Sequence, residues 1–391
     1  MRERIDARAM TALSGGHLAV DFAGGALFVL IPYLHDKFHL TYTLTAVLVL
    51  TATISGSLVQ PLFGLWSDRR GAIWLIPFGV AAGGIGIALA AVAPVYGLVV
   101  LCVVLSGLGT AAFHPEGSKF AAFVSGRKRA SGMSLFSVGG NLGFGLGALA
   151  AALLVHGLGL HGAALLVVPC LLAAALLLSQ REYLLGFVPD RETMRRGGGD
   201  DDYRALGLLL TVITFRSLAW YGLLTFVPLW EEQQGHSKQY GTAVLWAMLL
   251  VGGIGTITAG PIADRIGLRT VLLVANTAIC PLMLVFVLVG GALGAAALAL
   301  VGIAVIGTFG ITMVMAQQYL PTKIGMASGL SIGFSIGLGG IAAVFLGAVA
   351  DSVDLRTALY ISSTAPIVAT ALTAVLPRER GRALEPEVAV P

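Results

Sequence analysis

A small set of ionisable side chains lies inside long apolar stretches of this sequence. His17 and Asp21 are four residues apart in SGGHLAVDFAGG, so both would lie on one face of a helix. His114 and Glu116 flank a proline in a later apolar stretch, and Arg216 lies midway along another. A charged side chain at the centre of a bilayer costs about 2.5–3.5 kcal/mol on insertion scales. Residues kept at that cost are candidates for binding protons or an anion.

The residue types indicate which part of this chemistry each could do. Burial disfavours an ionised carboxylate and a nearby cation favours it, so we expect Asp21 to change protonation as Arg216 and substrate approach or leave. Histidine titrates near neutral pH, so His17 or His114 could assist with that proton. The carboxylate of Glu116 could also assist. The guanidinium of Arg216 is planar and always charged, and it can bind a carboxylate or phosphonate through two parallel hydrogen bonds.

We assign further polar and aromatic side chains of these stretches to substrate binding beside Arg216. They are Trp220, Tyr221, Asn141 and Gln317.

Structural roles are the alternatives for each of these residues. Asp21 and Arg216 could form a permanent ion pair, and His17 could simply hydrogen-bond a neighbouring carbonyl. His114 could be a donor in helix packing, and Glu116 could form an ordinary surface pair with the lysine three residues later.

The elements that must position these residues are membrane-spanning helices. The chain has 391 residues, of which 57% are hydrophobic and only 11% are charged, against about 25% charged in soluble domains. A spanning helix needs about 20 mostly apolar residues. Twelve such runs are predicted, at 9–34, 43–66, 72–93, 96–123, 130–156, 162–180, 205–230, 240–263, 269–290, 292–318, 325–349 and 356–376. The predicted fold class is therefore an all-α membrane protein with twelve transmembrane helices.

The distribution of basic residues predicts the orientation of these helices. If both termini lie on one side, 20 of the 24 Lys and Arg residues fall on that side. Because positive charge accumulates in cytoplasmic loops, we expect both termini to be cytoplasmic. The net charge of +4 comes from basic residues scattered between apolar runs, so no nucleic-acid partner is expected.

The chain contains two similar halves. GLWSDRRG at 64–71 recurs as GPIADRIG at 260–267, and ASGMS at 130–134 recurs as ASGLS at 327–331. Adding the offset of 196 residues to Asp21 gives Ser217, beside Arg216, so the acid and the arginine are expected to face each other at similar depth. We predict an N-terminal bundle at 1–180, a cytoplasmic linker at 181–204 and a C-terminal bundle at 205–391.

The doubled turn G-x-x-x-D-R-x-G resembles the signature loop of the major facilitator superfamily. HLAVDF, AFHPEGSK at 112–119 and SLFSVGGNLG at 134–143 further resemble its fosmidomycin-resistance branch, which exports a phosphonate antibiotic and other compounds in exchange for protons. The resemblance implies two pseudo-symmetric six-helix bundles whose first and fourth helices line a central cavity. It also implies a monomer in the bacterial inner membrane. No cofactor is expected, and no metal either, because the three cysteines lie far apart without metal-ligand spacing.

The repeated turn has a structural and a functional interpretation. It could simply reverse the chain on the cytoplasmic side, with its aspartate accepting hydrogen bonds from backbone donors or meeting the positive end of a helix. The resemblance favours a latch between the halves that must break when the carrier changes conformation. The residues assigned to this latch are Gly64, Asp68, Arg69, Gly71, Asp264 and Arg265.

The Gly-rich stretch SVGGNLGFGLGALAA resembles the fifth-span motif of antiporters in the superfamily. Ala148 stands where that motif usually has a proline. A smooth face for close helix packing is the alternative interpretation of these glycines.

Together these features predict a proton-coupled antiporter that exports a drug or a small anionic or zwitterionic metabolite. Its expected partners are a small-molecule substrate, protons and the lipid bilayer. The alternative is a proton-coupled uptake symporter for a sugar, an organic acid or a phosphorylated compound. An enzyme or a receptor is disfavoured, because the sequence shows no phosphate-binding Gly-rich loop, metal-ligand helix or nucleophile–base pair.

Overall fold

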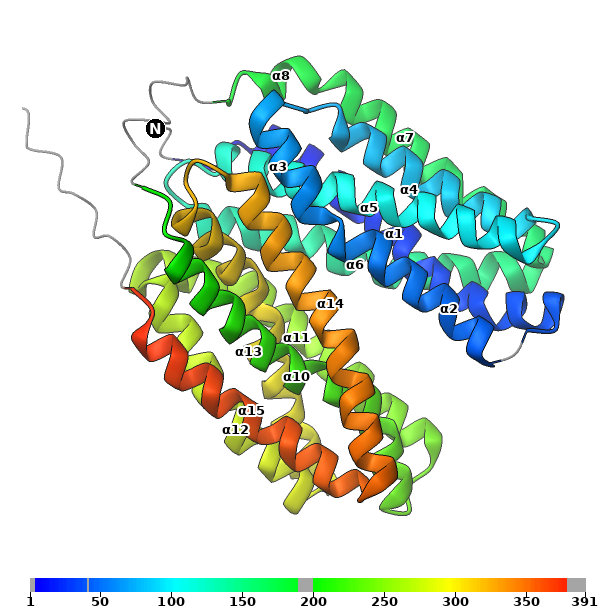
Figure 1. Ribbon diagram of the computed structural model, residues 1–391, viewed down its shortest axis with the longest axis vertical. Coiled ribbons are helices and arrows are strands. Elements are labelled where there is room, and N and C mark those ends of the chain that lie inside the picture. Colours follow the sequence, from blue (N-terminus) through cyan, green and yellow to red (C-terminus); the bar gives the residue numbers. More distant parts are fainter. Residues whose placement is uncertain (1–3, 41, 189–199, 378–391) are drawn as a thin grey trace, which may run out of the picture.

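The protein is a bundle of long helices (Figure 1). The computed structural model describes residues 4–40, 42–188 and 200–377. Within them, twelve helical segments are long and apolar enough to cross a membrane, which confirms the predicted twelve spans. The helices are α1 (Ala7–Phe38), α2 (Tyr42–Thr53), α3 (Gln60–Arg70), α4 (Leu75–Val92), α5 (Tyr96–Val124), α6 (Arg129–Leu158), α7 (Val167–Ser179), α8 (Arg181–Leu185), α10 (Tyr203–Gln233), α11 (Lys238–Ile266), α12 (Leu268–Leu288), α13 (Gly291–Tyr319), α14 (Ile324–Ser352) and α15 (Leu355–Val375).

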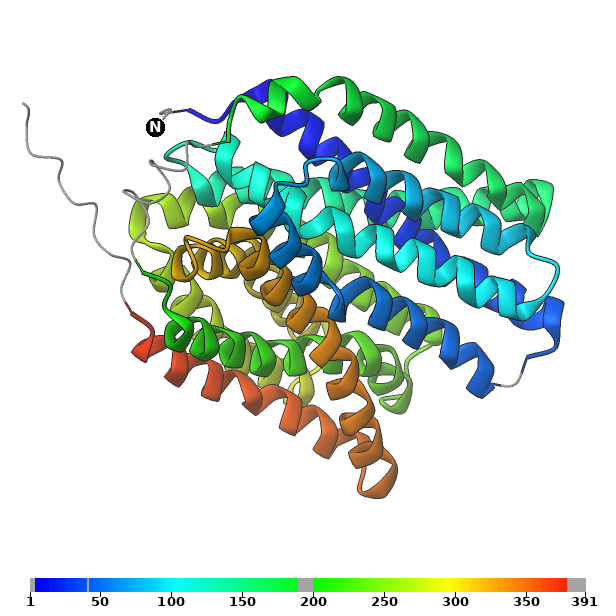
Figure 2. The same ribbon diagram turned by 45° about the horizontal axis from the view of Figure 1, so that its top comes forward.

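The helices pack as two groups that meet closely near one end. Helices α1 to α7 contact one another, and helices α10 to α15 form a second set of mutual contacts. The closest contacts between the sets join α3 with α14 and α6 with α11, and α5 with α14 and α6 with α13 also connect them. We call the end that carries α8 and the start of α10 the linker end. The two sets diverge from it toward the opposite, far end (Figures 1 and 2).

Two of the predicted spans are not uniform α-helices. The second is interrupted by a π-helical turn at Ile54–Leu58 between α2 and α3. Pro61 has no N–H to donate to the Ser57 carbonyl one turn earlier, and a π turn absorbs such a break in the hydrogen-bond ladder. The sixth span begins with a 3₁₀ segment at Leu160–Leu166 before α7.

Glycines at every fourth position of α6 bring this helix against α1. An added Cβ at Gly139, Gly143 or Gly147 would overlap the backbone of α1, one turn further along that helix for each successive glycine. In lipid, where the hydrophobic effect does not drive helices together, such close backbone approach is a main source of association. The packing interpretation of the Gly-rich stretch therefore accounts for these three residues.

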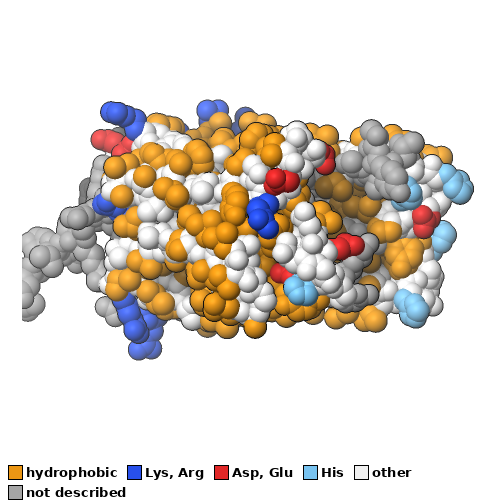
Figure 3. All heavy atoms as spheres, turned by 90° about the horizontal axis from the view of Figure 1, so that it is seen from below, with side chains coloured by type: hydrophobic (Ala, Val, Ile, Leu, Met, Phe, Trp, Pro, Cys, Tyr) orange, Lys and Arg blue, Asp and Glu red, His pale blue; other side chains and the backbone are white. Residues whose placement is uncertain are grey.

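The outer surface is apolar between two polar ends. Leu250 and Val344 expose 73% and 75% of their surface on the sides of α11 and α14, as expected of side chains that face lipid tails. Seen from below, Lys and Arg side chains gather mainly at the linker end and histidines mainly at the far end, while a further basic group lies beside acidic and histidine side chains in the middle of the view (Figure 3).

The start of α10 is fastened to the connection between α13 and α14. The Asp202 N–H donates to the Tyr319 carbonyl at 2.7 Å, and the Asp201 carboxylate accepts from the Thr322 hydroxyl at 2.6 Å. Partial burial raises the pKa of Asp201, but the hydrogen bonds from Thr322 and Lys323 outweigh burial and hold that pKa below its ordinary value. Residues 189–199 of the predicted linker lie outside the described residues, so the domain boundaries stay a prediction.

Substitution of a packing glycine tests the close contact between α4 and α5. An added Cβ at Gly109 would come within 2.6 Å of the Gly79 carbonyl oxygen, whereas nothing lies within 4 Å of the same position at Gly97 in the same helix. We expect Gly109→Ala to destabilise the protein by about 1–3 kcal/mol, as overpacking does, and Gly97→Ala to leave it unchanged. The melting temperature in detergent measures both, and equal values would contradict the proposed contact.

Candidate functional site

Asp21 lies between two histidines in the first group of helices. Its Oδ2 is 3.2 Å from Nε2 of His17, one turn earlier on α1. Its Oδ1 is 3.3 Å from Nε2 of His114 on α5. Both histidines are buried, with 7% and 4% of their surface exposed, and the Asp21 side chain is 23% exposed. We call these three residues the His–Asp–His cluster.

The other ring nitrogen of each histidine faces a backbone carbonyl. Nδ1 of His17 is 2.8 Å from the carbonyl oxygen of Phe136 on α6, and Nδ1 of His114 is 2.9 Å from that of Thr110. The His17 ring also stacks on the Phe136 ring, with centroids 4.2 Å apart. These contacts hold both imidazoles with Nε2 toward the carboxylate.

The cluster is also the one set of three metal-type donors that the described residues bring within 4.8 Å of one another. Each imidazole meets a different oxygen of Asp21 at hydrogen-bond length, however. This is the arrangement of two separate N···O contacts, whereas metal ligands converge on a single point.

Arg216 is the buried cation of the second group of helices. It is 0% exposed, its Nη1 donates to the Thr308 hydroxyl of α13 at 2.6 Å, and its guanidinium lies 4.7 Å from the centre of the Phe309 ring. Its Nε and Nη2 have no hydrogen-bond partner among the described residues. These two nitrogens form one edge of the planar guanidinium, which is the edge that binds a carboxylate side-on.

The structure does not pair Asp21 with Arg216. Asp21 contacts the two histidines, and the partners of Arg216 belong to its own group of helices. A permanent ion pair between them, one of the structural alternatives, is therefore absent from this conformation within the described part of the chain.

The other assigned substrate residues lie in several surroundings. Trp220 is buried with its ring 6.4 Å from that of Phe309, and Tyr221 packs against Gly339 of α14. Asn141 of α6 donates to the Thr256 hydroxyl of α11 at 3.1 Å.

Gln317 lies at a contact between the two groups of helices. Its Nε2 donates to the Ser328 hydroxyl at 2.9 Å and to the Ser118 carbonyl at 3.4 Å. Its Oε1 is buried and has no partner in the described ranges.

Glu116 is separate from the His–Asp–His cluster although it lies two residues after His114. It is 1% exposed and pairs with Lys119 at 2.6 Å, while the Ser67 hydroxyl donates to it and Lys119 donates to Ser67. The opposite directions of His114 and Glu116 follow from their spacing, because α5 continues through Pro115 and residues i and i+2 do not face each other.

The aspartates of the repeated turns each cap a helix of the opposite group. Asp68 of α3 accepts from the N–H groups of Gly325 and Met326 at the start of α14, both at 2.9 Å. Asp264 of α11 accepts from Ala130 and Ser131 at the start of α6, at 3.2 and 3.0 Å. A carboxylate is stabilised at a helix N-terminus by the free N–H groups and the helix dipole. We call this pair the crossed caps.

The glycines of the turn serve these caps, whereas its arginines lie outside them. An added Cβ at Gly64 would overlap the backbone of Gly325, and Gly71 ends α3 with a φ of +63°. Arg265 is exposed, and among the described residues it has no ion-pair partner.

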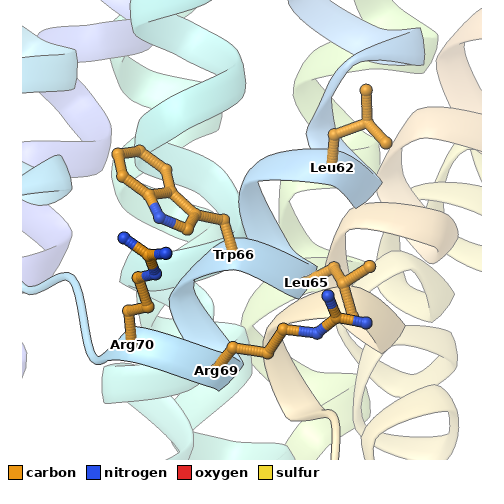
Figure 4. A pocket seen from close by; sticks show the side chains of 5 residues that line it. All are labelled: Leu62, Leu65, Trp66, Arg69 and Arg70. Carbon is orange, nitrogen blue, oxygen red and sulfur yellow. The ribbon is translucent and has the colours of Figure 1, made fainter.

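Arg69 lines a surface pocket of about 400 Å³ together with Leu62, Leu65, Trp66 and Arg70. In Figure 4 the two guanidinium groups extend from α3 in different directions.

The sequence named both His114 and Glu116 as possible partners of His17 and Asp21 but did not distinguish between them. His114 lies in a separate span nearly a hundred residues later, and nothing in the pattern distinguishes its ring from a packing donor. The sequence gives no signal for the role of Thr308 either, because a threonine in a spanning helix usually forms a hydrogen bond with the backbone of its own helix. It does so here with Ala304 at 2.9 Å while it also accepts from Arg216.

Removing one charge tests the crossed caps. Asn in place of Asp68 keeps one acceptor oxygen but turns an NH₂ group toward a backbone donor, so we expect the closed linker end to lose about 1.5–3 kcal/mol of stabilisation. Spin labels at Arg127 and Arg265, in a chain without its three cysteines, report the separation of the groups. Asp68→Asn should add a population with a longer distance between the two labels. Asp351→Asn at the far end serves as the control and should leave the distribution unchanged. An unchanged distribution would exclude a latch at Asp68.

Comparison with known proteins gives concordant results. Residues 13–344 match the Major Facilitator Superfamily. The chain is 31% identical to the MFS-type transporter YfnC of Bacillus subtilis, over 90% of this chain and 88% of that protein. It is 30% identical to the fosmidomycin resistance protein of Escherichia coli, over 94% and 92% of the two chains.

Solved structures agree on the fold. The transporter FucP in its outward conformation superposes with a TM-score of 0.75 at 14% identity, over 95% of this chain and 99% of that one. With twelve spans, the repeated turn and this match over most of its length, the chain belongs to the Major Facilitator Superfamily and is a multi-pass membrane transporter rather than an enzyme.

Proposed function

We propose that the protein is a proton-coupled antiporter that exports a small anionic or zwitterionic compound, such as a drug of the phosphonate class. The observation that carries the proposal is the presence of two separate buried ionisable sites. The His–Asp–His cluster lies in one group of helices, and Arg216, with an unpaired edge, lies in the other.

Arg216 supports the anionic character of the substrate. A fully buried guanidinium with two unsatisfied nitrogens is costly, because burial removes its hydration and no acidic side chain of the described residues replaces it. An oxyanion that binds side-on to Nε and Nη2 removes this penalty. The aromatic rings of Phe309 and Trp220 beside it offer apolar surface to the rest of the molecule.

The His–Asp–His cluster supports coupling to protons. It sets two imidazoles, the side chain best suited to exchanging protons under physiological conditions, against one carboxylate. The Asp21 side chain is partly exposed, which gives water a route to the cluster. Because the two sites are separate, substrate and protons need not compete by direct contact. They act on the same equilibrium between conformations, each binding one conformation more tightly.

The crossed caps support alternating access. They close the linker end in this conformation, and we place that end in the cytoplasm because the basic residues gather there. The conformation then faces outward, where the cluster takes up protons and substrate leaves. Inversion breaks both caps, releases protons inside and admits the next substrate.

The similarity to the fosmidomycin resistance protein supports export as the direction of transport. Proteoliposomes test this direction. With an imposed pH gradient and fosmidomycin as the probe, an antiporter moves substrate against the direction of proton flow. Movement of both in the same direction would instead establish an uptake symporter.

Replacement of Asp21 tests the proton side. We expect Asp21→Asn to abolish pH-driven accumulation of fosmidomycin, because an amide cannot exchange the proton, while exchange of labelled for unlabelled substrate persists. Asp36→Asn, on an exposed position of the same helix, is the matched control. Undiminished pH-driven transport by Asp21→Asn would rule out the assigned role.

Replacement of Arg216 tests the substrate side. Lys keeps the charge but loses the two-nitrogen edge, so we expect Arg216→Lys to weaken anion binding about 10- to 100-fold, the value of one or two charge-assisted hydrogen bonds. Thermal-shift titration with fosmidomycin measures the change, and Arg204→Lys, exposed on the same helix, is the control. Equal affinities for the two variants would place the substrate elsewhere.

A further inference from the structure

The geometry of the His–Asp–His cluster fixes how many protons it holds. Nδ1 of His17 faces the Phe136 carbonyl at 2.8 Å and Nδ1 of His114 faces the Thr110 carbonyl at 2.9 Å. A carbonyl oxygen only accepts, so each Nδ1 must carry a hydrogen. In a neutral imidazole with hydrogen on Nδ1, Nε2 presents a lone pair.

Both Nε2 atoms face oxygens of one carboxylate, at 3.2 and 3.3 Å. If Asp21 were ionised and both histidines neutral, each of these contacts would oppose two lone pairs. One shared proton satisfies one contact, so two protons are needed to satisfy both. They can lie on the two Nε2 atoms, or one on Nε2 and the other on the facing oxygen of Asp21. Either placement gives the cluster a net charge of +1.

We propose that His17, Asp21 and His114 form one site that holds two protons in this conformation, so that a transport cycle which empties the site moves two protons. The inference rests on the proposed function and specifies its proton load. Loss of one proton leaves one N···O contact repulsive. Loss of the second makes both repulsive, which weakens the Asp21–His114 contact between α1 and α5.

No other charge competes for these protons within the described residues. Helices α2, α4, α5, α6 and α7 and the 3₁₀ segment Leu160–Leu166 pack against α1. Helix α2 carries no charged or histidine side chain, and His161 of the 3₁₀ segment is exposed. Helix α4 has no ionisable side chain, and α7 has only the thiol of Cys170, which donates to the Ala19 carbonyl. On α5, Glu116 and Lys119 pair with each other. On α6 the ionisable residues are Arg129 and His156, at its two ends.

Gly140 of α6 positions the cluster. An added Cβ there would overlap His17 Nε2 and come within 2.6 Å of Asp21 Oδ2. A methyl group at this position therefore separates the two partners. Gly145 of the same helix has nothing within 4 Å of its added Cβ and provides a matched control.

Nitrogen-15 NMR of the full chain, labelled at its seven histidines, reads the proton load directly. The His17→Gln and His114→Gln variants assign the two signals. At pH 7.5, where an ordinary histidine is only about 10% charged, we expect hydrogen on both Nδ1 atoms and at least one imidazolium. Gly140→Ala should return His17 to ordinary titration and reduce pH-driven fosmidomycin transport, whereas Gly145→Ala should change neither.

Two results would overturn the inference. Two neutral imidazoles at pH 7.5 would mean that the site holds fewer than two protons. Histidine signals that shift on addition of EDTA would mean that a metal ion occupies it. These two NMR results test only the proton load of the cluster. Failure of the proposed function would be seen separately, as a lack of pH-driven transport by the unmodified protein. Melting temperatures of all variants verify that they are folded.

Discussion

Close approach of helix backbones is the constraint on which the rest of this structure depends. Lipid tails are as apolar as leucine side chains, so helices in a bilayer gain little from burying hydrophobic surface against each other. Gly139, Gly143 and Gly147 let α6 lie directly on α1. That contact brings the Phe136 carbonyl to His17 and leaves Gly140 beside Asp21. The polar cluster is positioned by residues that carry no polar side chain.

Under the proposed function, the two halves have different roles that follow from how each one stabilises its buried charge. The carboxylate of Asp21 has two imidazoles as partners, while Arg216 has a hydroxyl and an aromatic ring but no counter-ion within the part of the chain that the structure describes. A buried ion without a partner is costly, so the arginine is suited to a substrate that brings its own negative charge. The paired acid is suited to protons instead. The repeat-related positions, which the sequence predicts at similar depth, would therefore carry two complementary chemistries under the proposed function.

The crossed caps are built from the same aspartate in both copies of the repeat. Each carboxylate binds the first N–H groups of a helix that belongs to the other group, so both contacts break together when the groups separate. Nearby, Glu116, Lys119 and Ser67 form a buried polar network on the same side as Asp68, with Lys119 3.8 Å from its carboxylate. Contacts of this kind are modest singly, which suits a closure that must be reversible.

The sequence by itself determined the number of spans, the repeated halves and the family, because hydrophobic length and repeated motifs are local properties of the chain. It also placed His17 and Asp21 on one helix face, since four residues make about one turn. Only the tertiary structure decided that His114 completes the cluster, that Glu116 does not, and that Arg216 meets Thr308 rather than Asp21. Those contacts depend on how each helix is rotated about its axis and how closely it approaches its neighbours. The residue pattern along one helix does not encode the rotation of the helices beside it.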